Sequence, residues 1–270
     1  MTRDGDGRMA LVTGASAGIG KALAEVFAAN GFDLILTARR ENRLRAVGAE
    51  LELRHKIKAH IFQADLADPI APLNLCQAFA ARGLQVDVLI NNAGYGVPGA
   101  YTSSPWETQA AFMQVLVHAP FELAHRLLPA MQAQRYGRIL NVASVAGLMP
   151  GAAGGTLYAA AKSAMIKFSQ SIHLENEDKG VHVTALCPGF THSEFHDVTG
   201  SREQVSALPG YWWLTADQVA IAAYRAVQRN KAVEVPGLFY KALVQLPKIL
   251  PDGLALAIMR SQSKRFRDTD

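Results

Sequence analysis

Short apolar runs alternate with longer stretches in which apolar residues recur every three or four positions. The runs are rich in Val, Ile, Leu and Ala, which is typical of strands that are buried on both faces. The longer stretches have the spacing of amphipathic helices. We expect strands at residues 9–13, 33–38, 57–64, 86–90, 138–142, 181–187 and 232–235, and helices at 19–29, 41–55, from Asp68-Pro69 onward, 105–134, 158–178 and 216–229.

The alternation of strand and helix predicts one doubly wound, Rossmann-type α/β domain with a seven-stranded parallel sheet. Right-handed crossovers place helices on both faces of such a sheet. We assign residues 1–236 to this domain and residues 237–270 to a C-terminal helical extension of it. The extension mixes apolar residues at helical spacing with basic ones. It could cap a binding site, pack between subunits or touch a membrane surface, and the first two alternatives are favoured.

The composition narrows the class of protein. With 270 residues, 50% of them hydrophobic, the chain can bury a sizeable core and is not intrinsically disordered. The net charge of +4 is mild, so we expect no nucleic-acid partner. Cys76 and Cys187 lack metal-binding spacing, which predicts buried thiols in a reducing compartment and no metal site. A polar N-terminus and the lack of an ~18-residue apolar run favour a cytoplasmic protein without a membrane span.

A glycine-rich segment, TGASAGIG at residues 13–20, joins the first predicted strand to the first helix. Glycine allows a sharp turn and a close approach of the backbone to a diphosphate, and a helix N-terminus binds anions through its free N–H groups. The glycine spacing is GxxxGxG rather than GxGxxG. The pattern predicts a dinucleotide site whose binding residues are Gly14, Ser16, Gly18, Ile19 and Gly20.

The end of the second strand indicates which nicotinamide cofactor is bound. An acidic residue there would bind the ribose 2′-hydroxyl of NAD, whereas arginine suits the 2′-phosphate of NADP. The strand ends in Arg39-Arg40, and Glu41 already opens the next helix. Two guanidinium groups can form charge-assisted hydrogen bonds with a phosphate. The sequence therefore favours NADP(H) over NAD(H).

Further motifs follow in a fixed order. They are Ala64-Asp65-Leu66, Asn91-Asn92-Ala93-Gly94, Ser144, Tyr158-Ala159-Ala160-Ala161-Lys162 and Pro188-Gly189. With the glycine-rich segment, they make the chain resemble the short-chain dehydrogenase/reductase (SDR) family over about residues 8–236. The resemblance implies that residues 1–236 form a dinucleotide-binding catalytic domain. It also implies an oxidoreductase that moves a hydride between NADP(H) and a ketone, an aldehyde or a secondary alcohol.

The resemblance assigns three catalytic residues. Tyr158 would be the general acid/base, Lys162 would tune it and bind the cofactor ribose, and Ser144 would polarise the substrate carbonyl. Tyr158 and Lys162 are four residues apart and share one helix face. A phenol has a pKa near 10, and a neighbouring ammonium group lowers it toward the working pH. Further cofactor contacts implied by the resemblance are Asp65, Leu66, Asn91, Ala93, Gly94, Pro188, Gly189, Thr191 and Ser193, besides Tyr158 and Lys162.

The sequence departs from the family where an asparagine usually takes part in a proton relay, since Leu116 occupies that position. Leucine cannot make the side-chain hydrogen bonds, but its main-chain carbonyl remains, and Pro120 has no N–H to bind that carbonyl. We expect a weakened or altered relay. An alternative function is therefore a catalytically weak NADP(H)-binding protein with a regulatory or scaffold role.

Aromatic residues cluster in a segment at 190–214, where the family carries a substrate loop. The residues expected to line an apolar pocket are Tyr95, Leu148, Met149, Phe190, Tyr211 and Trp212. Ordinary core packing is an equally good explanation of the tryptophan. No Lys or Arg is placed to bind a substrate carboxylate, which favours a small apolar carbonyl or alcohol substrate. The resemblance also implies a homodimer or homotetramer, formed through helices near 110–135 and 156–178.

Overall fold

A central sheet organises the chain in the computed structural model, which describes residues 3–97, 99–194 and 209–266. Its seven strands have the order β3-β2-β1-β4-β5-β6-β7, and all six pairings are parallel. The predicted α/β fold with a seven-stranded parallel sheet is confirmed. The strands are β1 (Met9–Thr13), β2 (Asp33–Ala38), β3 (Ala59–Gln63), β4 (Val88–Asn91), β5 (Gly137–Val142), β6 (Val181–Leu186) and β7 (Val233–Glu234).

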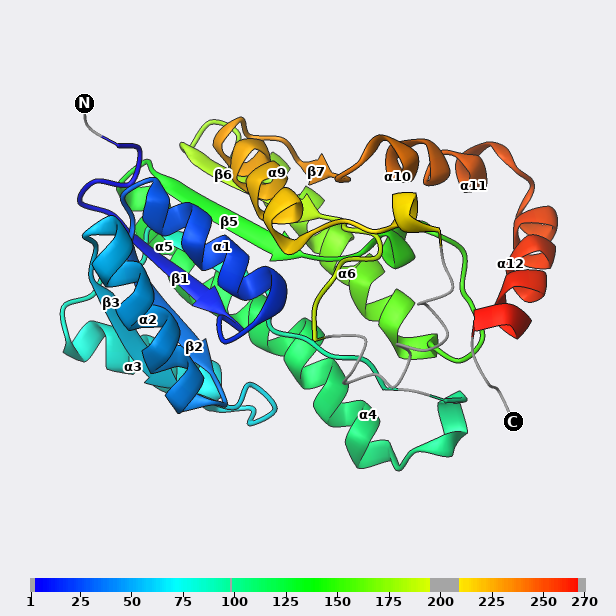
Figure 1. Ribbon diagram of the computed structural model, residues 1–270, viewed down its shortest axis with the longest axis horizontal. Coiled ribbons are helices and arrows are strands. Elements are labelled where there is room, and N and C mark those ends of the chain that lie inside the picture. The colour runs from blue at the N-terminus through cyan, green and yellow to red at the C-terminus, as the bar shows by residue number, and fades with distance from the viewer. Residues whose placement is uncertain (1–2, 98, 195–208, 267–270) are drawn as a thin grey trace.

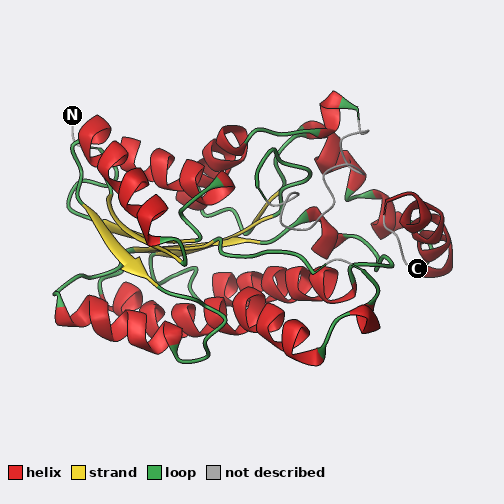
Figure 2. Cartoon of the chain, turned by 60° about the horizontal axis from the view of Figure 1, so that its bottom comes forward, coloured by secondary structure: helices red, strands yellow, loops and turns green. Residues whose placement is uncertain are grey.

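Two helical layers enclose the sheet, as Figure 2 shows. One layer holds α1 (Gly18–Ala29), α2 (Glu41–His55) and α9 (Ala216–Gln228); the other holds α3 (Ala71–Ala81), α4 (Trp106–Met113), α5 (Ala119–Ala133) and α6 (Thr156–Leu174). The apolar strand residues serve both layers. In β1, Ala10 and Val12 pack in the first core, whereas Leu11 between them packs in the second. Neighbouring strand residues point to opposite faces of the sheet, and both faces are covered by helices. A central strand such as β1 is therefore a nearly continuous apolar run.

The predicted long helix at 105–134 is wrong in one place. A π-helical turn (Gln114–His118) separates α4 from α5, and the N–H of Ala119 donates to the Gln114 carbonyl. Pro120 has no N–H to offer the Leu116 carbonyl four residues earlier, which favours a wider turn at this point. The helix expected from Asp68-Pro69 also begins later, at Ala71, because residues 68–70 form a turn in which Asp68 accepts the N–H of Ile70.

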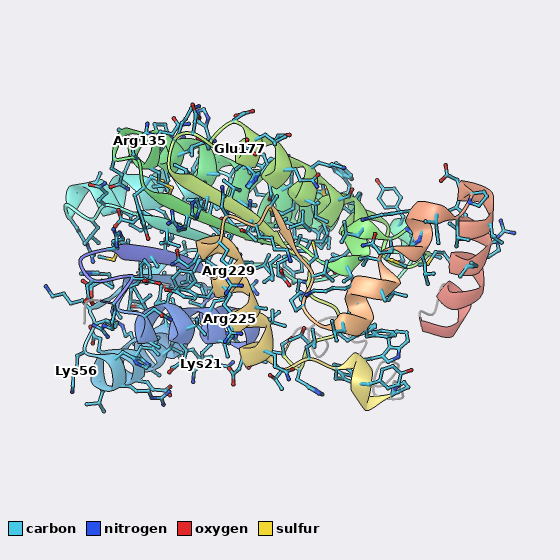
Figure 3. The ribbon with its side chains drawn as sticks, turned by 90° about the horizontal axis from the view of Figure 1, so that it is seen from above. Lys21, Lys56, Arg135, Glu177, Arg225 and Arg229 are labelled. Atoms are coloured by element: carbon cyan, nitrogen blue, oxygen red, sulfur yellow. The ribbon has the colours of Figure 1, made fainter. Side chains whose placement is uncertain are left out.

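The predicted boundaries of β1, β2 and α2 are correct, and the remaining boundaries differ from the predictions by at most four residues. The connections between strands and helices include three short 3-10 helices, at Tyr101–Ser103, Val145–Leu148 and Gly210–Trp212. Charged side chains of both signs lie on the outside of the fold, including Arg135 and Glu177 near one end of the sheet, Arg225 on α9 and Arg229 just after it (Figure 3).

The C-terminal extension leaves the sheet after β7 and continues as α10 (Leu238–Leu243), α11 (Leu246–Ile249) and α12 (Asp252–Phe266) (Figure 1). It is anchored mainly through Tyr240 and Val244, which are buried in a third apolar cluster. Several of its apolar side chains are exposed, among them Leu238 and Ile249. No helix among the described residues has the length and apolar character that a membrane crossing requires.

Candidate active site

The sequence-predicted residues follow four strands that end at one edge of the sheet. The glycine-rich segment leaves β1, Asn91 ends β4, Ser144 follows β5, and Pro188 follows β6. Since β2 and β4 lie on either side of β1, the chain leaves the sheet in opposite directions at this point. In such sheets the resulting crevice at the carboxyl ends of the strands is where ligands bind.

The glycine-rich segment has the backbone geometry that a phosphate cradle needs. Gly14 and Gly18 adopt φ values of 67° and 53°, in the left-handed region that favours glycine. A Cβ on Gly20 would lie 2.2 Å from the Gly14 carbonyl oxygen. The α1 N-cap, Ala17, offers no side-chain acceptor, so the first N–H groups of α1 are left for another partner. Ile19, in this first turn, packs against the first core.

The loop after β4 is tied directly to the glycine-rich segment. The Thr13 hydroxyl accepts the N–H groups of Asn92 and Ala93 at 2.9 and 3.0 Å, and the Asn92 amide donates to the Thr13 carbonyl. Asn91 instead faces the core, where its amide donates to Asn141 Oδ1 at 2.8 Å. These bonds place Ala93 beside the cradle and join β4 to β5, and they give Asn91 a role in the sheet.

The expected 2′-phosphate region contains a set of paired charges. Arg40 Nη2 donates to Ser16 Oγ at 3.2 Å and to Glu194 Oε2 at 3.0 Å. Arg43 Nη1 donates to Glu194 Oε1 at 2.7 Å. Arg43 and Glu194 are not among the residues predicted from the sequence. Arg43 could have been found from its spacing, because it lies three residues after Arg40 and faces the same side of the helix start.

The other adenosine-side residues lie around this region. Arg39 is exposed. Burial raises the pKa of the nearby Tyr95 hydroxyl, and the positive charge of Arg39 partly offsets this increase. Asp65 is exposed after β3 and accepts the N–H of Ala67, whereas Leu66 is buried in the second core. Gly94 packs against the side chain of Leu116, whose atoms would lie 3.7 Å from a Cβ on that glycine.

Ser144 follows β5, and Tyr158 and Lys162 lie on α6. Lys162 is buried, and its Nζ donates to the Val142 carbonyl at 2.7 Å and lies 5.8 Å from the centre of the Tyr158 ring. Burial lowers the pKa of Lys162 to about 8. The turn after Ser144 lies tightly on α6, because a Cβ on Gly147 would be 2.6 Å from the Lys162 carbonyl carbon. Ser144 Oγ accepts the Ala146 N–H at 3.1 Å.

The two cysteines differ from their prediction in one respect. Cys187 is buried, as predicted, and burial raises the pKa of its thiol to about 12, so it is protonated. Cys76 is only half-buried, at the margin of the second core. Neither is in a disulfide. Among the residues that the structure describes, no group of His, Cys, Asp and Glu has the arrangement of a metal site.

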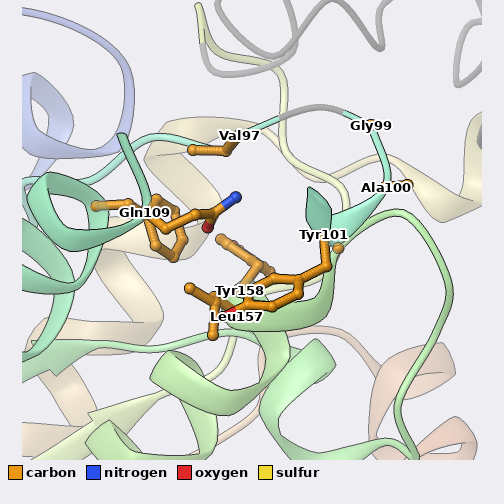
Figure 4. A pocket seen from close by; sticks show the side chains of 9 residues that line it. Val97, Gly99, Ala100, Tyr101, Gln109, Leu157 and Tyr158 are labelled. Carbon is orange, nitrogen blue, oxygen red and sulfur yellow. The ribbon is translucent and has the colours of Figure 1, made fainter. Parts of the chain in front are cut away.

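A small hollow, open to solvent, lies beside Tyr158 between the loop after β4 and the start of α6 (Figure 4). It is lined by Val97, Gly99, Ala100, Tyr101, Gln109, Phe112, Gly155, Leu157 and Tyr158. The Gln109 amide donates to Ser104 Oγ at 2.7 Å. None of the six residues predicted for the substrate pocket lines this hollow.

The six predicted pocket residues fall into two groups. Leu148, Met149 and Phe190 pack on the third apolar cluster. Trp212 and Tyr211 join them through ring contacts with Phe190 and Phe239. Tyr95 is separate, since its ring packs edge-on against Phe112. Of the predicted loop at 190–214, residues 195–208 lie outside the described residues.

Tyr240 is a further residue that the sequence did not reveal. Its hydroxyl accepts the Phe190 N–H at 2.9 Å and donates to the Trp212 carbonyl at 2.5 Å. Its ring lies on Gly189, where a Cβ would be 2.0 Å from a ring carbon. Tyr240 therefore ties α10 to both ends of the aromatic segment, and Gly189 is required for this close contact.

The residues after Pro188 cross in front of the glycine-rich segment. Pro188 is buried, and its carbonyl accepts the N–H of Val145 in the turn after Ser144. Thr191 is buried and pairs with Leu214 in a short parallel bridge. Ser193 lies against Gly18, where a Cβ would be 3.0 Å from the Ser193 Cβ. The predicted residues that follow β1 and those that follow β6 thus meet at the phosphate cradle.

Comparisons with known proteins agree with this arrangement. A family model described as short chain dehydrogenase matches residues 8–204. Nodulation protein G of Rhizobium sp. (strain N33) is 36% identical over 238 residues, which cover 86% of this chain and 93% of that protein. The 3-oxoacyl-[acyl-carrier-protein] reductase FabG of Escherichia coli (strain K12) is 34% identical over 189 residues, 70% of this chain and 75% of that one.

A solved structure extends the similarity to three dimensions. A short-chain dehydrogenase from Sphingobium yanoikuyae in complex with NADPH has a TM-score of 0.79 and 30% sequence identity. The alignment covers 93% of this chain and 94% of that one. The chain therefore belongs to the short chain dehydrogenase family and is an oxidoreductase of that type.

Proposed function

We propose that the protein transfers a hydride between NADP(H) and a small apolar ketone, aldehyde or secondary alcohol, with Tyr158 as the general acid/base. One observation carries the proposal: Tyr158 lines a solvent-accessible hollow while a buried lysine lies next to its ring. The buried cation favours the phenolate form of Tyr158, and a phenol with a lowered pKa can exchange a proton near neutral pH.

Each catalytic residue has a distinct task in this proposal. In the direction of reduction, the Tyr158 hydroxyl donates its proton to the carbonyl oxygen of the substrate. Ser144 Oγ already accepts one backbone N–H, which leaves its own O–H to donate to the same oxygen. Lys162, with a pKa of about 8, is mostly protonated at pH 7 and stabilises the phenolate that remains.

The residues of the crevice fit a nicotinamide dinucleotide. The positive-φ glycines and the free N-terminus of α1 suit a diphosphate, since side chains at Gly14 or Gly20 would close the cradle. Arg40, Arg43 and Ser16 offer the donors that a 2′-phosphate requires. When bound, the nicotinamide supplies or accepts the hydride. Arg39, Asp65, Leu66, Asn91, Ala93, Gly94, Pro188, Gly189, Thr191 and Ser193 remain the proposed further contacts.

The proposal for the substrate rests on the lining of the hollow. Val97, Ala100, Phe112 and Leu157 contribute apolar side chains, and Gln109 and Tyr101 are its polar side chains other than Tyr158. A relative named as a 3-oxoacyl-[acyl-carrier-protein] reductase supports carbonyl reduction as the reaction class. We assign the substrate to the apolar carbonyl compounds and their alcohols.

Steady-state turnover of a ketone and aldehyde panel, with NADPH and NADH compared, tests this function. Turnover of at least one apolar ketone, faster with NADPH at low cofactor concentration, is the expected result. Tight NADPH binding without turnover of any compound would instead favour a second function, that of an NADP(H)-binding regulatory or scaffold protein. The buried Leu116, an apolar group where the family usually has asparagine, is the observation that favours this alternative.

We further propose a homodimer or homotetramer in the cytoplasm. Trp106 at the start of α4 and Leu174 at the end of α6 expose 63% and 66% of their surface, which suits helices that pack against another subunit. Light scattering after gel filtration gives the mass; a monomer at all concentrations would contradict the proposal.

A further inference from the structure

One carboxylate occupies the place that the proposed function gives to the 2′-phosphate of NADP(H). Glu194 accepts hydrogen bonds from Arg40 and Arg43 through its two oxygens, at 3.0 and 2.7 Å. Arg40 also donates to Ser16 in the phosphate cradle. The two guanidiniums thus face one anion, and that anion comes from a segment more than 150 residues away along the chain.

The backbone before Glu194 is fixed to the fold at several points. The N–H of His192 donates to the Leu214 carbonyl at 3.0 Å, and the His192 ring stacks on Trp213 with centroids 4.5 Å apart. Ser193 rests on Gly18. These contacts hold the Glu194 carboxylate next to Arg40 and Arg43.

The charges decide which anion binds more strongly. The hydrogen bonds from Arg43 and Arg40 lower the pKa of Glu194, so its carboxylate is charged at neutral pH. All three side chains are nearly half exposed, at 44–47%, and such ion pairs in water are weak. A phosphate monoester carries up to two charges and three acceptor oxygens, so it gains more from two guanidiniums than a carboxylate does.

We propose that Glu194 is an internal competitor for the 2′-phosphate, whose carboxylate binds Arg40 and Arg43 in the cofactor-free protein and leaves them when a 2′-phosphorylated nucleotide binds. The proposal rests on the NADP(H) preference in the proposed function. It makes Glu194 a specificity-determining residue, because the competition lowers the affinity for NADP(H) and leaves the affinity for NAD(H) unchanged.

Calorimetric titration with two nucleotide fragments tests the competition. The probes are 2′,5′-ADP, which carries the 2′-phosphate, and 5′-AMP, which lacks it. For Glu194→Gln we expect an affinity for 2′,5′-ADP that is about three- to tenfold higher, because exposed ion pairs with both arginines no longer oppose binding. The affinity for 5′-AMP stays unchanged.

A matched control removes a neighbouring carboxylate that does not face the site. Glu41 lies at the start of the same helix and pairs with Arg45. Glu41→Gln makes the same change in net charge, and we expect less than a twofold effect on either probe. An equal gain from both substitutions would show a general charge effect and overturn the competition.

The outcomes separate this inference from the proposed function. If the wild type prefers 2′,5′-ADP and Glu194→Gln does not increase the preference, the competition is wrong and the cofactor preference stands. If neither protein prefers 2′,5′-ADP, both are wrong. A wild type without preference and a Glu194→Gln protein with it would support strong competition. Loss of 5′-AMP binding in Glu194→Gln would overturn the inference by showing that the carboxylate holds the ribose.

Discussion

The two ends of the proposed cofactor crevice, a phosphate end and a catalytic end, use charge in opposite ways. At the phosphate end, Arg40, Arg43 and Glu194 are about half exposed and pair with one another in water. At the catalytic end, Lys162 is buried, and its ammonium group donates a hydrogen bond to the Val142 carbonyl. Exposed charges interact weakly and are screened by salt, whereas a buried charge changes its own pKa and acts strongly on its neighbours.

The two ends are also built differently. The phosphate end is a backbone cradle, closed by hydrogen bonds that the N–H groups of Asn92 and Ala93, in the loop after β4, donate to the Thr13 hydroxyl. The catalytic end depends on close packing, with Gly147 against α6 and Gly189 against the Tyr240 ring. We therefore expect substitutions at the phosphate end to adjust affinity, and substitutions at the catalytic end to change turnover or stability.

The largest expected effect is on turnover at the catalytic end. Tyr158→Phe removes the proton donor, and kcat should fall by about 10²- to 10⁴-fold, the usual contribution of general acid/base catalysis. The affinity for 2′,5′-ADP, measured by calorimetry, should not change. Tyr101→Phe is the control, because Tyr101 lines the same hollow and its ring is partly exposed. A Tyr158→Phe enzyme with near wild-type kcat would remove Tyr158 from the mechanism.

The buried lysine should appear in the pH dependence of stability. Its pKa is about 8 when folded and 10.5 when unfolded, so the unfolded chain binds more protons between these values. The free energy of unfolding therefore rises from pH 8 to 10.5, by on the order of 3 kcal/mol from this group, and the cost of burial is fully present below pH 8. Urea unfolding of wild type and Lys162→Met should show a difference that changes over this range; parallel curves would contradict the buried charge.

The two hydrogen bonds of the Tyr240 hydroxyl, to Phe190 and to Trp212, should contribute to stability. Tyr240→Phe leaves the Phe190 N–H and the Trp212 carbonyl without their shared partner, and we expect a loss of about 1–3 kcal/mol in the free energy of unfolding. Tyr211→Phe is the control, since Tyr211 is 69% exposed and should change stability by less than about 0.5 kcal/mol. Equal effects of the two substitutions would show that these two hydrogen bonds add nothing to the free energy of unfolding.

The smallest of these effects is expected at the phosphate end. Arg40→Ala should weaken 2′,5′-ADP binding about tenfold, because one charged donor is lost, and added salt should reduce the difference. Arg45→Ala is the control on the same helix, since Arg45 pairs with Glu41 instead. No change for Arg40→Ala would place the 2′-phosphate elsewhere.

The sheet could be predicted from the sequence because its signal is local. Strands such as β1 and β2 are buried on both faces, so most residues in each run are apolar, and the predicted boundaries of both were correct. The π-helical turn before Pro120 was missed, because a periodic pattern records side chains and not the register of backbone hydrogen bonds. Pro120 was noted, but its effect on the turn required the structure.

The site could be predicted only where its residues form local motifs. Gly14, Tyr158 and Lys162 belong to short runs with fixed spacing, and the structure places these runs along one edge of the sheet. Glu194 and Tyr240 act through partners far away in the chain, and nothing local marks them. The predicted aromatic pocket shows the same limit, because rings that are close in sequence packed into a cluster beside α10 and not around the hollow at Tyr158.

The most direct test compares Arg40→Ala and Tyr158→Phe in one steady-state assay, with NADPH varied at a saturating concentration of the best ketone. The account predicts that Arg40→Ala raises the KM for NADPH about tenfold and leaves kcat within about twofold of wild type. Tyr158→Phe should lower kcat at least about 100-fold and leave that KM nearly unchanged. If both substitutions change the same parameter to a similar extent, the two ends of the crevice do not have the separate roles assigned to them.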